Sequence, residues 1–154
     1  MLNPRPGTFR AARREDGASI LSMLHKLATW EGATHPPRLD QSTLERDAFA
    51  ADPKLRILVA RNSSDENVGF LSYYSNYSSW KGSPGVHIGD LWVSPAYRGQ
   101  GVGAALLKQV IDANENSRID VFVIKDNDAR FFYERLGFRE QTQWKLYRRE
   151  RDKF

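Results

Sequence analysis

The sequence predicts a mixed α/β domain of the α+β class, in which helices flank a largely antiparallel sheet. Short apolar segments follow one another directly in the middle of the chain, as the strands of an antiparallel meander do. In the second half, strand-like segments alternate with segments of helical periodicity. The chain has 154 residues, which is enough for one domain with a buried core.

The first part of the chain is expected to contain a strand and two helices. Thr8–Arg13 is a short candidate strand, and Asp16 is placed to cap a helix over Ala18–Trp30. Apolar residues recur on one face of that helix, at Ile20, Met23, Leu24 and Leu27. The segment Ser42-Thr43-Leu44-Glu45 has the pattern of a capping box, which predicts a second helix that runs to about Ala51.

Three strands are predicted next, over Arg56–Asn62, Val68–Tyr77 and Val86–Val93. In the last of them, the alternation of apolar residues slips by one position at Gly89-Asp90. A slip of one residue predicts a β-bulge, which splays this fourth strand from its neighbour and leaves N–H groups unpaired. The alternative is that the strand simply ends at Gly89.

The rest of the chain predicts further alternation of helices and strands. Helices are expected over Gly101–Asn114 and Asp126–Leu136, the second ended by Gly137 as its C′ residue. Strands are expected over Arg118–Ile124 and Trp144–Arg148, with another near Phe138–Gln141. The expected sheet thus has about six to seven strands, with about four helices around it.

Composition narrows the class of protein. Hydrophobic residues make up 40% and charged residues 27%, which is typical of a globular rather than a disordered chain. No apolar run approaches the roughly 20 residues of a membrane span, and no secretory leader is expected. The absence of cysteine excludes disulfides, thiolate metal sites and a cysteine nucleophile, and the three histidines lack metal-ligand spacing. Residues 1–7 are interpreted as an N-terminal extension and residues 8–154 as a single domain.

A glycine-rich loop between a strand and a helix is the most informative local feature. Glycines alternate at 99, 101 and 103, directly before the predicted helix. Such a loop lets main-chain N–H groups converge on an anion, toward which the helix directs its positive end. The glycine spacing matches neither a Walker A loop nor the Rossmann fingerprint. The loop itself predicts a pyrophosphate ligand, and the alternative is a plain tight turn. The formal net charge of +4 is compatible with a nucleic acid or with a polyanionic small molecule as partner.

Two motifs occur in the second half of the chain, Arg98-x-x-Gly101-x-Gly103 and the Asn127…Ala129…Tyr133-Glu134…Leu136-Gly137-Phe138 segment. Together they resemble the GNAT family of acyl-CoA-dependent N-acetyltransferases. They occur in the family's order and separation, and the resemblance extends over about Phe9–Tyr147. The chain is most similar to the diamine (spermidine/spermine-type) acetyltransferases. The residues that carry this likeness are Val68–Gly82, Asp90–Val93, Trp144–Tyr147 and Trp30-Glu31.

The resemblance implies the GNAT fold and a binding mode for acetyl-CoA as cosubstrate, without a metal. The pantetheine arm would pair with the splayed strand, and main-chain amides of the loop would hold the pyrophosphate. The implied cosubstrate-binding residues are Leu91, Trp92, Val93, Arg98, Gly99, Gln100, Gly101, Val102, Gly103, Ala104, Asn127 and Tyr133. An N–H on the strand would polarise the thioester carbonyl, and Tyr133 would protonate the departing thiolate as general acid.

The acceptor side departs from the diamine subgroup at one position. The subgroup carries a Glu-Asp pair on the fourth strand, whereas this chain has Gly89 followed by Asp90. The amine must still lose a proton before it attacks, so Asp90 is the first candidate base, followed by Glu31 and His87. Glu31, Trp80 and Asp90 are the expected substrate-binding residues.

Several of these residues have a second interpretation. Asn127 also fits the role of a helix N-cap, and Tyr133 that of a core aromatic. Arg98 is alternatively a loop cation without ligand contact, and Trp80 a surface or interface aromatic.

The resulting expectation is a cytoplasmic, homodimeric N-acetyltransferase that binds neither nucleic acid nor membrane. It would transfer an acetyl group to a primary amine of a diamine-like or amino-acid-like molecule, by direct attack in a ternary complex. The alternatives are a non-catalytic acyl-CoA-binding module and a protein or peptide N-acetyltransferase.

Overall fold

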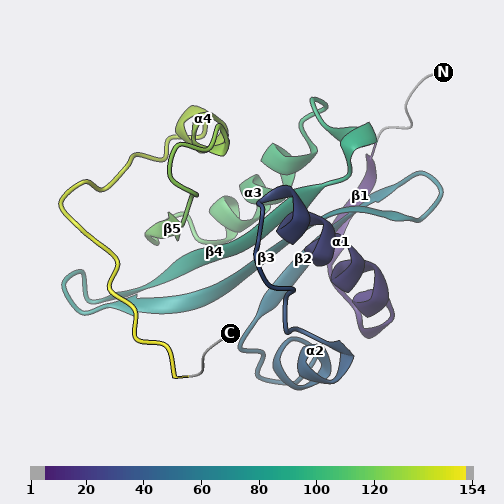
Figure 1. The fold of residues 1–154 in the computed structure, drawn as a ribbon, viewed down its shortest axis with the longest axis horizontal. Helices are drawn as coiled ribbons and strands as arrows, with labels where there is room; N and C mark the ends of the chain where they lie inside the picture. The colour runs from purple at the N-terminus through teal and green to yellow at the C-terminus, as the bar shows by residue number, and fades with distance from the viewer. Residues whose placement is uncertain (1–5, 152–154) are drawn as a thin grey trace. The chain divides into compact units, whose positions relative to one another are not determined.

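The computed structural model describes residues 6–151, with five strands and four α-helices among them (Figure 1). The chain divides into two compact units, whose boundary lies between Phe122 and Val123. The elements of the first unit are β1 (Pro6–Ala11), η1 (Arg14–Asp16), α1 (Gly17–Trp30), α2 (Gln41–Asp47), β2 (Arg56–Asn62), β3 (Asn67–Ser78), β4 (Ser83–Val93), η2 (Pro95–Tyr97), α3 (Val102–Ala113) and β5 (Ile119–Val121). The second unit contains α4 (Ala129–Arg135).

The sheet confirms the predicted class and falls short of the predicted strand number. Its order is β1-β2-β3-β4-β5, with antiparallel pairs throughout except the parallel pair β4–β5, which α3 connects. The strands expected near Phe138–Gln141 and over Trp144–Arg148 do not form in the described residues. Residues there alternate in polarity as strand residues do, but a strand also needs a neighbour for its backbone hydrogen bonds. The segment instead bends so that the Trp144 N–H donates to the Gln141 carbonyl, at 3.4 Å.

The ends of the first two helices differ from the expected ones. Asp16 precedes α1 but makes no capping bond to it, because its carboxylate is bonded elsewhere. The N-cap of α2 is Asp40, whose side chain accepts the Thr43 N–H at 2.8 Å, so the expected capping box at Ser42 is wrong. That helix ends at Asp47, where the chain folds back and two later amides bond to the Asp47 carbonyl. Of the expected extension, residues 1–5 lie outside the described residues, and Pro6 and Gly7 belong to β1.

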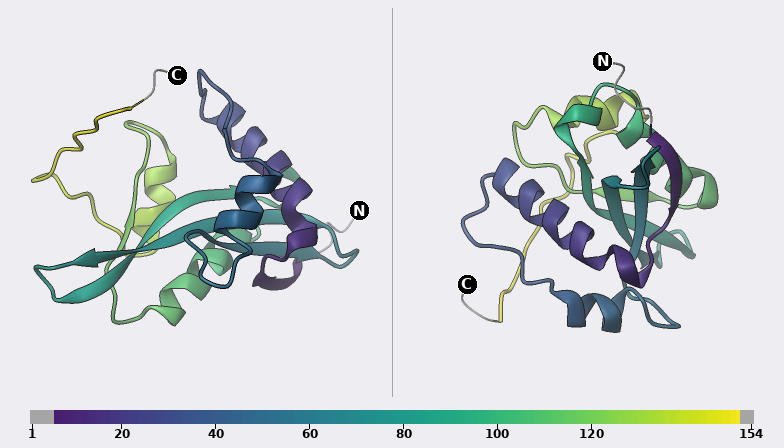
Figure 2. Two further views of the ribbon diagram at one scale, coloured as in Figure 1. Left: turned by 90° about the horizontal axis from the view of Figure 1, so that it is seen from below. Right: turned by 90° about the vertical axis from the view of Figure 1, so that its right-hand side faces the viewer.

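Helices cover both faces of the sheet in the first unit (Figure 2). α1 and α2 pack on one face, where the core consists of Ile20, Met23, Leu27, Leu44, Ile57, Val59, Phe70 and Trp92. α3 buries the opposite face through Val102, Leu106, Leu107 and Val110. Each such side chain contributes roughly 1.5–3 kcal/mol by its removal from water. None of the described helices combines the length and apolarity needed to cross a membrane.

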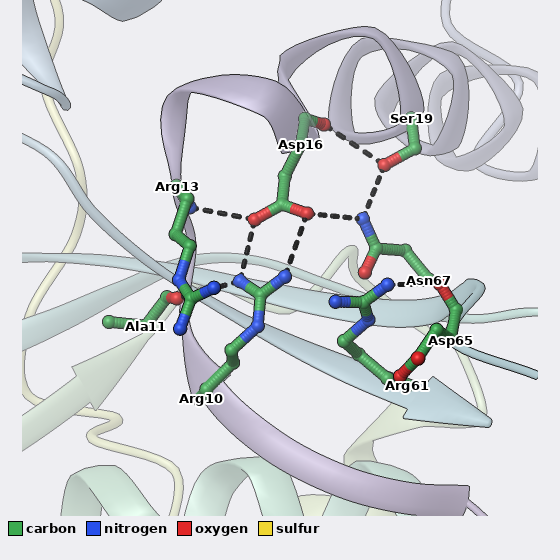
Figure 3. A network of polar contacts seen from close by, with 8 residues as sticks. All are labelled: Arg10, Ala11, Arg13, Asp16, Ser19, Arg61, Asp65 and Asn67. Carbon is green, nitrogen blue, oxygen red and sulfur yellow. Dashed lines mark hydrogen bonds and ion pairs between the residues drawn. The ribbon is translucent and has the colours of Figure 1, made fainter. Parts of the chain in front are cut away.

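A buried carboxylate joins β1, α1 and β3 (Figure 3). The Asp16 side chain is 5% exposed and accepts two hydrogen bonds from the Arg10 guanidinium, at 2.7 and 3.1 Å. It also accepts the Arg13 N–H at 2.7 Å and an Asn67 amide N–H at 3.0 Å. Burial alone would raise the pKa of Asp16, but the bonds from Arg10, Asn67 and Arg13 outweigh it and lower the pKa from 3.8 to about 2.

This network predicts an acid-sensitive contribution to stability. Because folding lowers the pKa of Asp16, its contribution is complete above pH 3.8 and disappears as the pH falls through about 2. The difference corresponds to about 2 kcal/mol of unfolding free energy. We expect Asp16→Asn to remove about this much at pH 7 and to flatten the pH dependence between 2 and 4, as measured by urea unfolding.

Asp112→Asn is the matched control, since Asp112 is 60% exposed in a pair with Lys108. This control should change the unfolding free energy by less than about 1 kcal/mol. Equal effects of the two substitutions would show that the Asp16 network does not stabilise the fold.

Candidate functional site

The predicted bulge is present in β4, and it opens one edge of the sheet. Ser72 pairs with Asp90 and Tyr73 with Ile88, so Gly89 is the extra residue between them. β5 pairs with β4 only over Val86–Ile88, on the near side of the bulge. Past Gly89, β4 keeps β3 on one side and has no strand on its other side among the described residues.

The backbone groups of Leu91 and Val93 face this open edge. The Ser94 N–H donates to the Val68 carbonyl at 2.8 Å and therefore points toward β3. Main-chain groups of successive strand residues point to opposite sides, so Trp92 and Asp90 also face β3, while Leu91 and Val93 face away. The strand's geometry is consistent with unpaired backbone groups at Leu91 and with an unpaired N–H at Val93, whereas the Val93 carbonyl accepts a hydrogen bond from Arg98 Nε.

The glycine-rich loop follows directly from the open edge. Gly99 and Gly101 have φ of 73° and 80°, a conformation that side chains rarely adopt, and no atom lies within 4 Å of a Cβ built on either. The first bond of α3 runs from the Ala105 N–H to the Gly101 carbonyl, at 2.9 Å. The four preceding amides, from Gly101 to Ala104, thus have no partner inside the helix. An anion placed there would meet several donors and the positive end of α3.

The loop is anchored through the residues that precede it. Asn62 is buried at the end of β2 and donates to the Tyr97 hydroxyl at 3.0 Å. Its side-chain oxygen accepts the backbone N–H groups of Ser64 and Glu66, each at 2.9 Å. These bonds fix η2, which leads from β4 into the loop.

Arg98 points back from the loop toward the sheet. Its Nε donates to the Val93 carbonyl at 2.8 Å, and its guanidinium carbon lies 4.5 Å from the Trp30 ring centre and 4.4 Å from that of Trp92. The two indoles meet edge to face, with their ring centres 6.4 Å apart. The Arg98 side chain thus lies against the two indoles, a contact that the sequence reasoning missed.

Two carboxylates lie on the α1 face of the sheet, the face on which Trp92 also lies. Asp90 precedes Trp92 by two residues on β4 and shares its face, and Glu31 ends α1 directly after Trp30. Burial raises the pKa of Asp90, although a hydrogen bond from the Ser72 hydroxyl, at 2.5 Å, opposes this shift. Burial and the charge of Asp90 both raise the pKa of Glu31. Neither carboxylate has a salt-bridge partner within the described residues.

A side chain at position 89 would clash with a residue of this site. A Cβ at that position would lie 2.9 Å from the Ser72 hydroxyl oxygen, the group that holds Asp90. Ser72 was not among the expected site residues, because a serine on an alternating strand carries no functional signal by itself. Only the register between β3 and β4 brings it to Asp90.

The remaining base candidate, His87, lies one step further along β4. Its ring is buried between Tyr74, at 5.1 Å, and Phe122, at 4.4 Å between ring centres. Burial lowers the pKa of His87, while the charge of Asp120 opposes this shift. The imidazole is therefore neutral at pH 7, as a base must be. No group of three potential metal ligands is found in the described part of the chain.

Other expected residues lie apart from this cluster or in the second unit. Trp80, at the tip of the β3–β4 hairpin, is 98% exposed in the single chain. Asn127 accepts the Ala129 N–H with its side chain at 2.8 Å, directly before Asp128, the N-cap of α4. Tyr133 lies in α4, where its carbonyl accepts the Phe138 N–H past the left-handed Gly137, as predicted for this helix end.

Comparisons with known proteins agree with the two motifs. Residues 21–138 match the Acetyltransferase (GNAT) family. The thialysine N-epsilon-acetyltransferase of Mus musculus is 31% identical over 156 residues, which cover 92% of this chain and 91% of the relative. The Homo sapiens spermidine/spermine N(1)-acetyltransferase-like protein 1 is 29% identical, over 94% of this chain and 22% of its own length.

Solved structures show the same fold. A probable acetyltransferase superposes with a TM-score of 0.81 at 23% identity, covering 96% of this chain and all of that one. With the open β4 edge, the glycine loop and a family match over most of its length, the chain belongs to the GNAT family of acetyltransferases.

Proposed function

We propose that this protein is an acetyl-CoA-dependent N-acetyltransferase for a small, cationic primary amine. The observation that carries the proposal is the open edge of β4 at Leu91 and Val93, which leads directly into the glycine loop at the start of α3. A backbone edge can pair with the amide groups of a pantetheine arm, and the loop amides can bind a diphosphate. Acetyl-CoA carries both groups, and the family uses it as cosubstrate.

The acceptor class follows from the charge on the α1 face. Burial raises the pKa of both Asp90 and Glu31, the charge of Asp90 raises the pKa of Glu31 further, and no described cation forms a salt bridge with either. A substrate ammonium would relieve this repulsion, whereas a second carboxylate would increase it. The exposed indole of Trp30, next to Glu31, offers a further surface for a cation. Relatives named for thialysine and for spermidine and spermine support a small amine of this kind.

The proposed reaction is direct attack of the neutral amine on the thioester carbonyl. Asp90, directly or through a water molecule, takes the proton that the ammonium must lose, and its raised pKa makes it a stronger base than an exposed aspartate. The new C–N bond forms as the C–S bond breaks, and Tyr133 gives its hydroxyl proton to the thiolate. The Leu91 N–H stabilises the carbonyl oxygen, and most of the rate comes from holding the reactants together.

We also propose that the protein forms a homodimer, as the family resemblance implies, and that it works in the cytoplasm without binding nucleic acid. Trp80, Tyr77, Trp144 and Tyr147 are largely exposed in the single chain, which is compatible with a partner subunit covering some of them. In a dimer, Trp80 would then have a role either at the interface or at the acceptor site.

The central test is acetyl transfer itself. Purified protein, acetyl-CoA and a panel of diamines, lysine analogues, amino acids and peptides are mixed, and the release of CoA is followed with a thiol reagent. We expect CoA release with at least one small diamine or lysine analogue. Tight CoA binding without release between pH 7 and 9 would indicate a non-catalytic module, and release with peptides alone would indicate a protein acetyltransferase.

Asp90→Asn separates the functional role of this residue from its effect on stability. Folding raises the pKa of Asp90, so its contribution to stability is favourable only while it is protonated and is lost as the pH rises through the folded pKa. At pH 7 the neutral amide should therefore raise the melting temperature, by about 2–4 °C per kcal/mol recovered, while turnover falls at least about tenfold. The melting difference should vanish at pH 3. A melting temperature that falls at pH 7 would contradict the proposal that burial of the charged Asp90 carboxylate destabilises the fold.

Tyr133→Phe tests the proposed general acid. The substitution removes one hydroxyl and keeps the ring, so we expect kcat to fall by about 10²–10⁴-fold with little change in the Kd for CoA. Phe132→Tyr, on the same helix, is a control that adds rather than removes a hydroxyl. Unchanged turnover in Tyr133→Phe would exclude the acid role.

A further inference from the structure

The Arg98 side chain contacts other parts of the protein and does not point toward the expected phosphate site. Its guanidinium is directed away from the loop, toward Val93 and the two indoles. No salt bridge holds it within the described residues, so the ring faces and one carbonyl are its recorded partners. Cation–π contacts of this kind contribute about 0.5–2 kcal/mol each when partly desolvated.

The three partners of Arg98 belong to different parts of the proposed site. Val93 lies on the open edge where the pantetheine arm would pair, and Trp92 anchors β4 in the core. Trp30 is the last residue of α1 and is 66% exposed, so little besides Arg98 and Trp92 holds its ring. Glu31 follows it directly and carries one of the two acceptor carboxylates. Because Trp30 contacts Arg98 and is bonded to Glu31, a shift of Arg98 would also shift Glu31.

The loop that carries Arg98 has open space beside its glycines. Outside the adjoining residues, nothing lies within 4 Å of a Cβ built at Gly99 or Gly101, and both have left-handed φ. A ligand bound in this space would add contacts to the loop and make it more rigid. The amides of the loop face the expected diphosphate, while the Arg98 side chain faces the end of α1. The loop thus borders both the expected acetyl-CoA site and the expected amine site.

We propose that Arg98 is a positioning residue that transmits acyl-CoA binding to the acceptor site, through its contacts with Trp30 and Trp92. This inference rests on the proposed function. Ordering of the loop by CoA fixes Arg98, which fixes Trp30 and with it the end of α1 and Glu31. Linkage is reciprocal, so a bound amine also strengthens CoA binding. The coupling is specific to arginine, because lysine has no Nε–H donor and no planar group to lie on two rings.

Hydrogen exchange of the backbone measures this coupling without an acceptor amine. The Glu31 and Gly32 amides bond to the last turn of α1, at 2.9 and 3.1 Å, and report on its end. In the wild-type protein, saturating free CoA should slow exchange over residues 28–32 by about tenfold, within the usual range of coupling between sites. In Arg98→Gln and in Trp30→Leu, at CoA concentrations that again saturate, this slowing should disappear, and Arg98→Lys should keep only part of it.

Matched controls separate the link from general damage. Arg46→Gln removes an arginine that is 72% exposed on α2, and it should leave the slowing intact. Trp30→Leu alters a ring that is 66% exposed, so the melting temperature should fall by only a few degrees through the loss of its contacts with Arg98 and Trp92. With the preferred amine from the acetyl-transfer panel, Arg98→Gln should raise KM for the amine about tenfold and change kcat much less.

The outcomes distinguish the inference from the function on which it rests. If CoA does not bind to the wild-type protein, the proposed function fails, and the inference fails with it. If CoA binds and acetyl transfer occurs, but exchange at the end of α1 does not change or changes equally in Arg98→Gln, only the link through Arg98 is overturned.

Discussion

The extra residue at Gly89 sets the geometry on which the whole site depends. Before the bulge, β4 is paired on both sides, with β3 and with β5. After it, β4 presents the backbone groups of Leu91 and Val93 to an open edge. The same bulge places Ser72 opposite Asp90, because a glycine leaves room for the serine hydroxyl. One local irregularity thus provides both an edge for the cosubstrate and a held carboxylate for the acceptor.

The chain that follows this bulge contributes both to a region that favours an anion and to one that favours a cation. The start of α3 and the glycine loop favour an anion, whereas Asp90 and Glu31 favour a cation, and the charge of Asp90 opposes the ionisation of Glu31. Elsewhere the first unit compensates its buried charge, as Asp16 shows with Arg10 and Asn67. The contrast between a carboxylate with a lowered pKa and two with raised pKa values separates a stabilising network from a site that is incomplete without substrate.

Much of the fold was predictable from local pattern. Alternation placed β2 at its observed bounds, and the register slip located the bulge, because both depend on which residues face the core. Gly137 ended α4 as predicted, since only its left-handed φ of 89° was needed. The errors arose where partners decide the outcome. Asp16 bonds to Arg10 instead of capping α1, and Trp144–Arg148 has no neighbouring strand in the described residues.

The sequence by itself determined the two motifs, the order of strands and helices, and the residues that bind or react if the family's chemistry holds. Each of these features depends on the type and spacing of residues within a short segment of the chain. The tertiary structure decided which distant residues meet: Ser72 with Asp90, Asn62 with Tyr97, and Arg98 between Trp30 and Trp92. These contacts depend on strand register and on how α1 packs against β4, which no local pattern specifies.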